Sequence, residues 1–149
     1  MPIGQVCIRE VLVAERDTSV QEAARLMRQH HVGDLVVVDA RNGHRVPVGI
    51  VTDRDIVISV VAPKLDPAVF TLGDLIVRKL VTISADLDIS EAIHEMRKHG
   101  VRRVPVVDKQ GQLVGIVTVD DLVQLLGAEL SELGKLISRE QVIETKNKR

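Results

Sequence analysis

Two stretches of sequence decide how this chain folds. Residues 48–55 read Val-Gly-Ile-Val-Thr-Asp-Arg-Asp, residues 114–121 read Val-Gly-Ile-Val-Thr-Val-Asp-Asp, and six of the eight positions are identical. In each copy an apolar run of strand length ends in a threonine, and an aspartate follows three residues later, where a helical pattern begins. A hydroxyl, free backbone N–H groups and a carboxylate at one strand-to-helix corner suit a ligand that carries phosphate and ribose hydroxyls.

The repetition extends beyond these two stretches. Residues 17–39 align with residues 86–108 at an offset of 69 residues, and ten of the 23 pairs are identical. After the following loop the offset falls to 66, so the first copy has three extra residues between Asp39 and Val46. A hairpin turn tolerates such a change in length. Each copy is therefore expected to form strand, helix, strand, strand and helix, and two copies are the smallest set that buries both sheet faces.

Apolar spacing and turn residues predict the individual elements. A helix capped by Thr18 or Ser19 should place Val20, Ala23, Ala24 and Met27 on one face. The other expected elements of the first copy are strands at 12–13, 35–38 and 46–51, a polar loop at 40–45 centred on Asn42-Gly43, and a helix at 53–61. The expected domains are a first repeat at 1–62, a linker at 63–70, a second repeat at 71–127, and a C-terminal helix and tail at 128–149.

Composition argues against several classes of protein. Aromatic residues make up 1% of the chain, with no Trp or Tyr, so the stacking platforms that single-stranded nucleic acids need are lacking. A formal net charge of -1 gives no general attraction to nucleic acid or to an anionic membrane. The one cysteine, Cys7, cannot form an internal disulfide, and no signal peptide or long apolar run is present. These features predict a cytoplasmic protein.

The order, spacing and duplication of these motifs resemble the CBS domain, named after cystathionine β-synthase, and a tandem pair of this kind resembles a Bateman module. The resemblance covers about residues 6–127. It implies an α/β (α+β) fold in which two β-α-β-β-α repeats are related by a pseudo-twofold axis, with a C-terminal helix added. It also implies two clefts between the repeats that bind adenosine-containing ligands such as AMP, ADP, ATP, NAD or S-adenosylmethionine. Such modules commonly form homodimers and regulate another protein, and this chain is similar to the stand-alone members of bacteria and archaea.

The resemblance assigns roles to residues of each cleft. Asp55 and Asp121 match the carboxylates that hold the ribose hydroxyls, and Thr52 and Thr118 match the hydroxyls that face phosphate. The first cleft would be formed by Ile50, Thr52, Asp55, Ile76, Val81, Thr82, Arg102, Arg103 and Val104. The second would be formed by Ile116, Thr118, Asp121, Cys7, Leu12, Val13, Gly33, Asp34 and Leu35.

The two clefts are not expected to be equivalent. The second repeat has Arg102-Arg103 where the first has Gly33-Asp34. Arginine offers a bidentate fork to phosphate, whereas an aspartate repels it. The first cleft is therefore the better candidate for a phosphate chain. The second could be empty, or could suit a neutral or cationic ligand such as adenosine or S-adenosylmethionine.

Each of these residues also has a purely structural interpretation. Thr52 and Thr118 can be helix N-caps, with Asp55 and Asp121 as acids in the first turn. The arginine pair can be solvated, and Cys7 can be a small buried apolar residue.

No sequence pattern points to catalysis or to a metal. Nucleophile elbows, Walker lysine loops and ligand-spaced clusters of His or Cys are lacking. The sequence therefore predicts a sensor with no catalytic residues and no required cofactor, for which an adenosine nucleotide is the regulatory ligand. The alternatives are a structural or regulatory partner subunit with vestigial clefts, which uses the apolar stripe of residues 128–144 to bind its partner, and a nucleotide-acting enzyme.

Overall fold

The computed structural model describes residues 1–147. These residues fold as two compact units, Met1–Val117 and a second unit that begins at Thr118. The elements of the first repeat are β1 (Val13–Ala14), α2 (Val20–His30), β2 (Asp34–Arg41), β3 (His44–Thr52), α3 (Asp53–Ile56) and the π-helical turn η1 (Val57–Val61). Those of the second are β4 (Ile83–Ser84), α5 (Ile89–His99), β5 (Arg103–Val107), β6 (Leu113–Thr118) and α6 (Val119–Asn147). Two short helices, α1 (Ile3–Val6) and α4 (Leu72–Leu75), each lead into a repeat.

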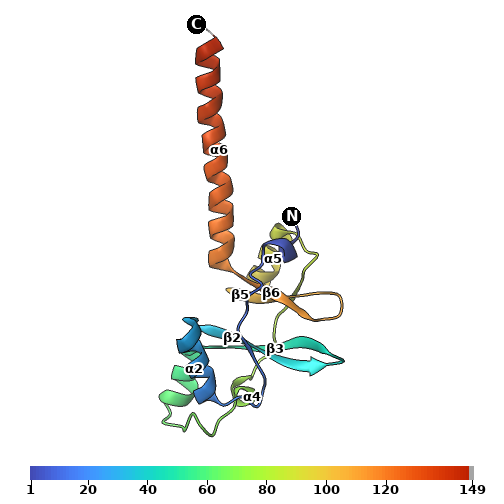
Figure 1. The fold of residues 1–149 in the computed structure, drawn as a ribbon, viewed down its shortest axis with the longest axis vertical. Helices are drawn as coiled ribbons and strands as arrows, with labels where there is room; N and C mark the ends of the chain where they lie inside the picture. The colour runs from blue at the N-terminus through green and yellow to red at the C-terminus, as the bar shows by residue number, and fades with distance from the viewer. Residues whose placement is uncertain (148–149) are drawn as a thin grey trace. The chain divides into compact units, whose positions relative to one another are not determined.

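Each repeat has its own three-stranded sheet, with strand orders β1-β2-β3 and β4-β5-β6. The outer strands β1 and β4 pair in parallel with β2 and β5, and β2 pairs with β3 in an antiparallel hairpin. Figure 1 shows this hairpin beside α2. The expected mixed fold of two β-α-β-β-α repeats followed by a C-terminal helix is confirmed.

Strand β2 is buried on both faces. Leu35 and Val37 pack with α2 and η1 in a cluster that also contains Leu72 of α4. Val36 and Val38 point the other way and pack against Leu113 and Ile116 of the second repeat. Because successive side chains of a strand point to opposite faces, a continuous apolar run is what a doubly covered strand requires. The second cluster joins the two repeats.

The β2–β3 hairpin is longer than the sequence predicts. A loop was expected over residues 40–45, but Arg41 still pairs with His44. Only Asn42 and Gly43 form the turn, with φ angles of 52° and 78°. Positive φ at both central residues defines the type I′ turn that matches the twist of the strands, so the ladder continues up to the turn. The three extra residues of the first repeat therefore extend a hairpin and do not enlarge a loop.

The first long helix of each repeat, α2 or α5, ends in a residue with a left-handed backbone, and α2 begins with a side-chain cap. Ser19 caps α2 by accepting a hydrogen bond from the backbone N–H of Glu22 at 3.1 Å. Ala23 is buried as predicted, but Ala24 is exposed because the face covered by the sheet is narrower than expected. His31 and Gly100 stand at equivalent positions just after α2 and α5, and both have left-handed backbones, with φ of 53° and 64°.

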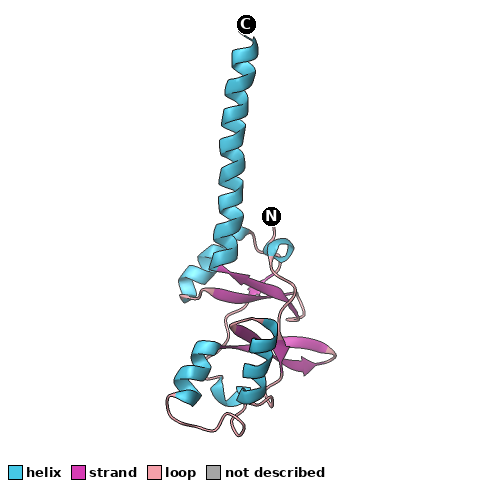
Figure 2. Cartoon of the chain, turned by 60° about the vertical axis from the view of Figure 1, so that its left-hand side comes forward, coloured by secondary structure: helices cyan, strands magenta, loops and turns pink. Residues whose placement is uncertain are grey.

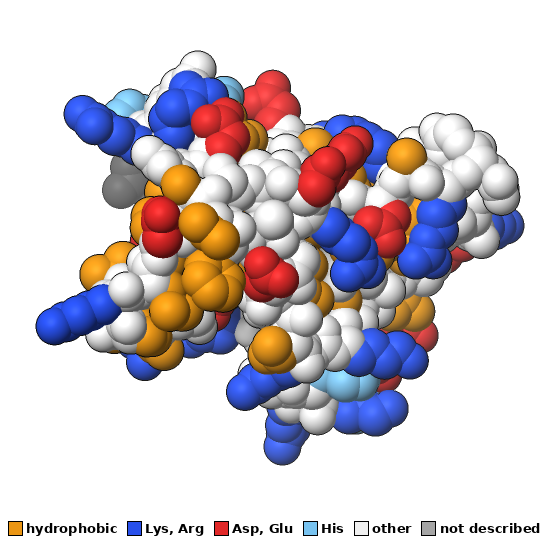
Figure 3. All heavy atoms as spheres, turned by 90° about the horizontal axis from the view of Figure 1, so that it is seen from below, with side chains coloured by type: hydrophobic (Ala, Val, Ile, Leu, Met, Phe, Trp, Pro, Cys, Tyr) orange, Lys and Arg blue, Asp and Glu red, His pale blue; other side chains and the backbone are white. Residues whose placement is uncertain are grey.

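The last helix of the first repeat changes its type part of the way along. It spans residues 53–61 as expected, but it is α-helical only in α3 and continues as the π-helical turn η1. Val57, Ile58 and Val61 on this segment are more than half exposed, while Val60 is fully buried. Figure 3 shows that hydrophobic side chains gather on the face seen from below.

The two leading helices are exchanged between the repeats. The helix α4 leads into the second repeat but packs beside the first, where Leu72 donates its N–H to Thr18 at 2.9 Å. The helix α1 leads into the first repeat but packs beside the second, where Ile3 donates its N–H to Leu87 at 2.7 Å. Each repeat therefore lacks a piece of its own core unless the other repeat is present.

Helix α6 is 29 residues long. Figure 2 shows it as one continuous helix. It contains both the final helix of the second repeat and the helix that the sequence places after it. Its buried residue is Leu122, whereas Leu126, Leu130, Leu133 and Ile137 lie exposed on one stripe. Neither α6 nor any other helix within residues 1–147 has the length and apolar character needed to cross a membrane.

Candidate functional site

The corner between β3 and α3 is built by a reciprocal cap. Thr52 Oγ1 accepts the backbone N–H of Asp55 at 3.1 Å, and Asp55 Oδ2 accepts the backbone N–H of Thr52 at 2.9 Å. This capping box satisfies two donors that a helix N-terminus leaves open. Both residues are half-buried. The structural interpretation of this pair is therefore correct, and any ligand contact would be an additional role.

A cleft of about 530 Å³ opens beside this corner, entirely within Met1–Val117. Drug-sized ligands are commonly bound in concavities of roughly 300–1,000 Å³. The cleft is lined by Gly49, Ile50, Thr52, Asp55, Ser59, Leu75, Ile76, Val77, Arg78, Lys79, Leu80, Val81, Val101, Arg102 and Arg103. Seven of the nine residues predicted for the first cleft are among them: Ile50, Thr52, Asp55, Ile76, Val81, Arg102 and Arg103.

The other two residues predicted for this cleft lie elsewhere. Val104 is fully buried in the protein core. Thr82 lines a separate hollow of about 520 Å³ beside β4 and α5, together with Ser84, His94 and Glu95. Thr82 precedes the short strand β4, which starts only at Ile83, and its side chain is exposed.

Ile76 reaches the cleft because α4 packs on the first repeat. A Cβ added to Gly49 would lie 2.7 Å from Ile76 Cδ1, so the glycine leaves the space that the isoleucine occupies. Cys7 and Gly115 repeat this arrangement in the second repeat, with Cys7 Sγ 2.7 Å from the same added atom. Each exchanged leading helix is therefore followed by an apolar side chain, Ile76 or Cys7, that packs against a glycine of the opposite repeat.

Cations dominate the charged lining of the cleft. Arg78, Lys79, Arg102 and Arg103 line it, with Asp55 as the single carboxylate. Arg78 and Lys79 follow the leading helix of the second repeat and were not predicted from the sequence to line the cleft. A signal was present, since the equivalent residues before the first repeat are Arg9 and Glu10, so one of the two positions reverses its charge.

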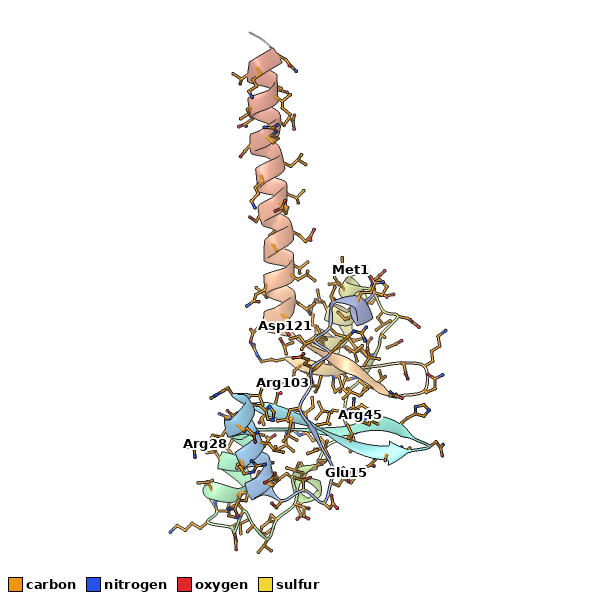
Figure 4. All side chains as sticks on the ribbon, in the orientation of Figure 1. Met1, Glu15, Arg28, Arg45, Arg103 and Asp121 are labelled. Carbon is orange, nitrogen blue, oxygen red and sulfur yellow. The ribbon has the colours of Figure 1, made fainter. Side chains whose placement is uncertain are left out.

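Arg103 is engaged by a carboxylate of the other repeat. Its guanidinium forms an ion pair with Asp34, and the two side chains are 39% and 24% exposed. Figure 4 labels Arg103, which stands at the start of β5, while Asp34 stands at the start of β2. The sequence predicted Arg103 at one cleft and Asp34 at the other. In the structure these two equivalent residues form an ion pair with each other.

The residues predicted for the second cleft belong to both compact units. Within Met1–Val117, Leu35 is fully buried, Leu12 packs on the core of the first repeat, and Val13 and Ile116 contribute to the cluster that joins the repeats. Gly33 is exposed. Cys7 is buried, and this burial raises the pKa of its thiol.

Within Thr118–Arg149, the corner at the start of α6 forms its own cap. Thr118 Oγ1 accepts the backbone N–H of Asp121 at 3.1 Å and donates its hydroxyl proton to Asp121 Oδ2 at 2.7 Å. The first corner differs, because there the carboxylate accepts a backbone N–H and not the hydroxyl proton. The two copies of the motif therefore present different hydrogen-bonding groups.

Residues 1–147 contain no group of three or more His, Cys, Asp and Glu side chains arranged to hold a metal ion.

The family is shown by comparison with known proteins. A model of the CBS domain matches this chain twice, at residues 3–62 and 72–128. The chain therefore belongs to the CBS domain family and contains a pair of these domains. An uncharacterized protein of Methanopyrus kandleri is 35% identical over 123 residues, which cover 83% of this chain but only 61% of that relative.

Two solved structures are similar to this fold. Hypoxic Response Protein I, solved with two coordinated zinc ions, matches with a TM-score of 0.70 and 34% identity over 83% of this chain and 98% of that one. The CBS domain pair of protein MJ0100, solved in complex with 5′-methylthioadenosine and S-adenosyl-L-methionine, matches with a TM-score of 0.72 and 27% identity. That match covers 87% of this chain and 98% of the other.

Proposed function

We propose that this CBS domain pair is a non-enzymatic sensor that binds a phosphate-bearing adenosine ligand in the cleft beside Thr52 and Asp55. The observation that carries the proposal is the composition of that one cleft. A hydroxyl and carboxylate corner, apolar side chains such as Ile50 and Ile76, and four cations all line the same space. Sugar hydroxyls, a flat apolar base and phosphates are the complementary groups of a nucleotide.

The corner keeps hydrogen-bonding capacity for a ligand. Asp55 uses Oδ2 for the cap, and within residues 1–147 no group bonds Oδ1, which can therefore accept from ribose hydroxyls. Thr52 Oγ1 accepts from a backbone N–H, so its own proton can be donated to a phosphate oxygen. A single pair of side chains can thus cap α3 and bind a ligand at the same time.

The ligand class is supported by a structural relative. The similar CBS pair of protein MJ0100 was solved with two adenosine compounds. Neither of them carries a phosphate, whereas the cleft of this chain is rich in cations, so we infer that nucleotides are preferred here. Binding would regulate the protein only if the ligand binds one arrangement of the repeats more tightly than another.

Calorimetric titration with adenosine, AMP, ATP, NAD and S-adenosylmethionine tests the proposal. The decisive variant is Asp55→Asn, because an amide oxygen can still cap α3 but accepts less strongly from ribose. Charge-assisted hydrogen bonds are about twice as strong as neutral ones, so we expect roughly tenfold weaker binding of all ribose-containing ligands.

A matched control exists in the same chain. Thr71 and Asp74 form a related cap at α4, in which the Thr71 N–H and hydroxyl donate to Asp74 Oδ2 at 2.9 Å and 3.2 Å, but neither residue lines the cleft. Asp74→Asn should leave ligand binding unchanged. Equal losses in the two variants would show that Asp55 acts only through helix stability.

Two other outcomes would replace the proposal. If no adenosine compound binds more tightly than about millimolar, the chain is better explained as a structural or regulatory partner subunit with vestigial clefts. If pure protein converts any of these ligands to a product, it is an enzyme. Analysis of the titrated mixtures by mass spectrometry separates binding from turnover.

We further propose that the protein is a homodimer and that α6 takes part in the contact. Its stripe of Leu126, Leu130, Leu133 and Ile137 repeats at intervals of four, three and four residues, as in helices that pair with one another. These side chains are between 43% and 69% exposed. A second copy would remove a large apolar surface from water.

A further inference from the structure

The pair of Asp34 and Arg103 joins the two repeats at equivalent positions. The two residues are separated by 69 residues, the offset that aligns the repeats in this region. Each stands at the first position of the central strand of its sheet, β2 or β5. The two residues occupy equivalent positions of the two repeats, and they meet with opposite charges.

Only one member of the pair lines the cleft. Arg103 is among the cleft residues, whereas Asp34 is not. The guanidinium that could bind a phosphate is therefore already neutralised by a carboxylate of the protein itself. A phosphate that needs Arg103 must displace Asp34 or share the guanidinium with it, and guanidinium binds both groups through the same fork of donors.

Competition of this kind favours ligands with more negative charge. Arg78 and Lys79 also line the cleft and are exposed, so a phosphate can be attracted there without disturbing the ion pair. A phosphate group carries a charge of about −1.5 to −2 at neutral pH. A longer phosphate chain presents several such groups, and it can interact with Arg78 or Lys79 while it also competes for Arg103.

We propose that Asp34 is a specificity-determining residue that competes with ligand anions for Arg103 and so makes the cleft selective for polyphosphate chains over single phosphates. The proposal deepens the proposed function, since it rests on this cleft being the place where a phosphate-bearing ligand binds. Asp34 acts as a positioning residue, through Arg103, and need not touch the ligand.

The test uses inorganic probes so that it does not depend on recognition of adenosine. Orthophosphate and tripolyphosphate are titrated into the full chain and into Asp34→Asn, which removes the competing charge. We expect orthophosphate affinity to rise about tenfold, the factor that corresponds to about 1.4 kcal/mol, and tripolyphosphate affinity to rise less. The preference for tripolyphosphate should therefore shrink.

Asp39→Asn is the matched control. Asp39 lies on the same strand, is 27% exposed, and pairs with Arg16 at 3.0 Å, away from the cleft lining. The Asp39→Asn variant loses the same charge as Asp34→Asn, and it should change the affinity for neither orthophosphate nor tripolyphosphate. Equal gains in Asp34→Asn and Asp39→Asn would mean that only the net charge matters, and the proposal would be wrong.

Two more variants separate competition from altered folding. In an Arg103→Gln background, Asp34→Asn should not change the affinity for either anion any further, because the guanidinium for which Asp34 competes is gone. Asp34→Glu keeps the charge and should keep the preference for tripolyphosphate. Thermal unfolding of each variant confirms that it is folded. A gain in orthophosphate affinity that persists without Arg103 would overturn the proposal.

Failure of this proposal can be told apart from failure of the proposed function. If the affinities for the anions change as expected, but the affinities for adenosine and ATP do not differ from those for simple phosphates, the adenosine proposal fails and the competition stands. If neither anion responds to Asp34→Asn, the competition fails, whichever nucleotides bind.

Discussion

Replacing Gly115 by alanine should be far more damaging than the same change at the equivalent Gly49. An added Cβ at Gly115 would lie 2.5 Å from the carbonyl oxygen of Ile8 and 2.7 Å from Cys7 Sγ. That carbonyl is fixed, because it accepts the N–H of Ile116 at 2.9 Å while Ile8 donates back to Ile116 at 2.9 Å. The clash can be relieved only by moving the backbone that joins α1 to the second repeat.

The magnitude follows from the atoms involved. Overpacking a filled site costs about 1–3 kcal/mol, and stretching two reciprocal hydrogen bonds costs roughly 1 kcal/mol each. Alanine regains about 0.5–1 kcal/mol because it loses less chain entropy than glycine. Gly115→Ala should thus lower the free energy of unfolding by about 2–4 kcal/mol, on the balance of these effects. At Gly49 the nearest atoms are the flexible end of Ile76, so we expect about 1 kcal/mol, the low end of overpacking.

Urea unfolding followed by circular dichroism measures both values, since the free energy of unfolding falls linearly with denaturant concentration. Gly127→Ala is the control, because nothing lies within 4 Å of its added Cβ, and helix propensity predicts a gain of up to about 1 kcal/mol. If Gly115→Ala is as stable as the parent chain, α1 is not held against the second repeat as the structure shows. The Gly49→Ala variant has a second readout, because displacement of Ile76 should weaken ligand binding in the cleft.

Three further predictions follow from other elements. His31→Gly should raise the free energy of unfolding by about 0.5–1 kcal/mol, because glycine adopts the left-handed backbone after α2 without strain; urea unfolding that shows a loss would contradict this. Replacing Leu130 and Leu133 together by glutamate should convert a dimer to a monomer in analytical ultracentrifugation, whereas Gln124→Glu, on the opposite side of α6, should not; a parent chain that is already monomeric would refute the α6 contact. Burial raises the pKa of the Cys7 thiol, so the folded chain keeps this proton at a pH where the unfolded chain has lost it. Stability should therefore fall as pH rises above about 8.5, and this part of the fall should be missing in Cys7→Ala.

The cap at Thr52 and Asp55 shows how sequence and structure answer different questions. The motif predicts a helix with an N-terminal cap, and the reciprocal hydrogen bonds of Thr52 and Asp55 confirm it. The same motif occurs at Thr71 and Asp74, but neither of these two side chains lines the cleft. Local sequence therefore predicts the cap, but only the packing of α4 and the second repeat determines which cap faces a cleft.

Differences between the expected and the observed elements have the same origin. The apolar pattern of residues 53–61 predicts the helix after β3, but no proline or glycine marks its change from α-helix to π-helix. The π-helical turn lets Val60 reach the core while its neighbours stay exposed. The exact end of the hairpin loop likewise depended on strand pairing that continues to Arg41 and His44.

The sequence by itself determined the family, the two β-α-β-β-α repeats and the identity of the residues at each corner, because duplicated motifs and hydrophobic periodicity are local properties of the chain. Only the tertiary structure decided that the leading helices are exchanged, that Arg78 and Lys79 line the cleft, and that Asp34 neutralises Arg103. The physical reason is that charge compensation and cleft formation depend on distances between residues far apart in the chain. The residue type determines the sign of each charge, and tertiary packing determines which opposite charge lies beside it.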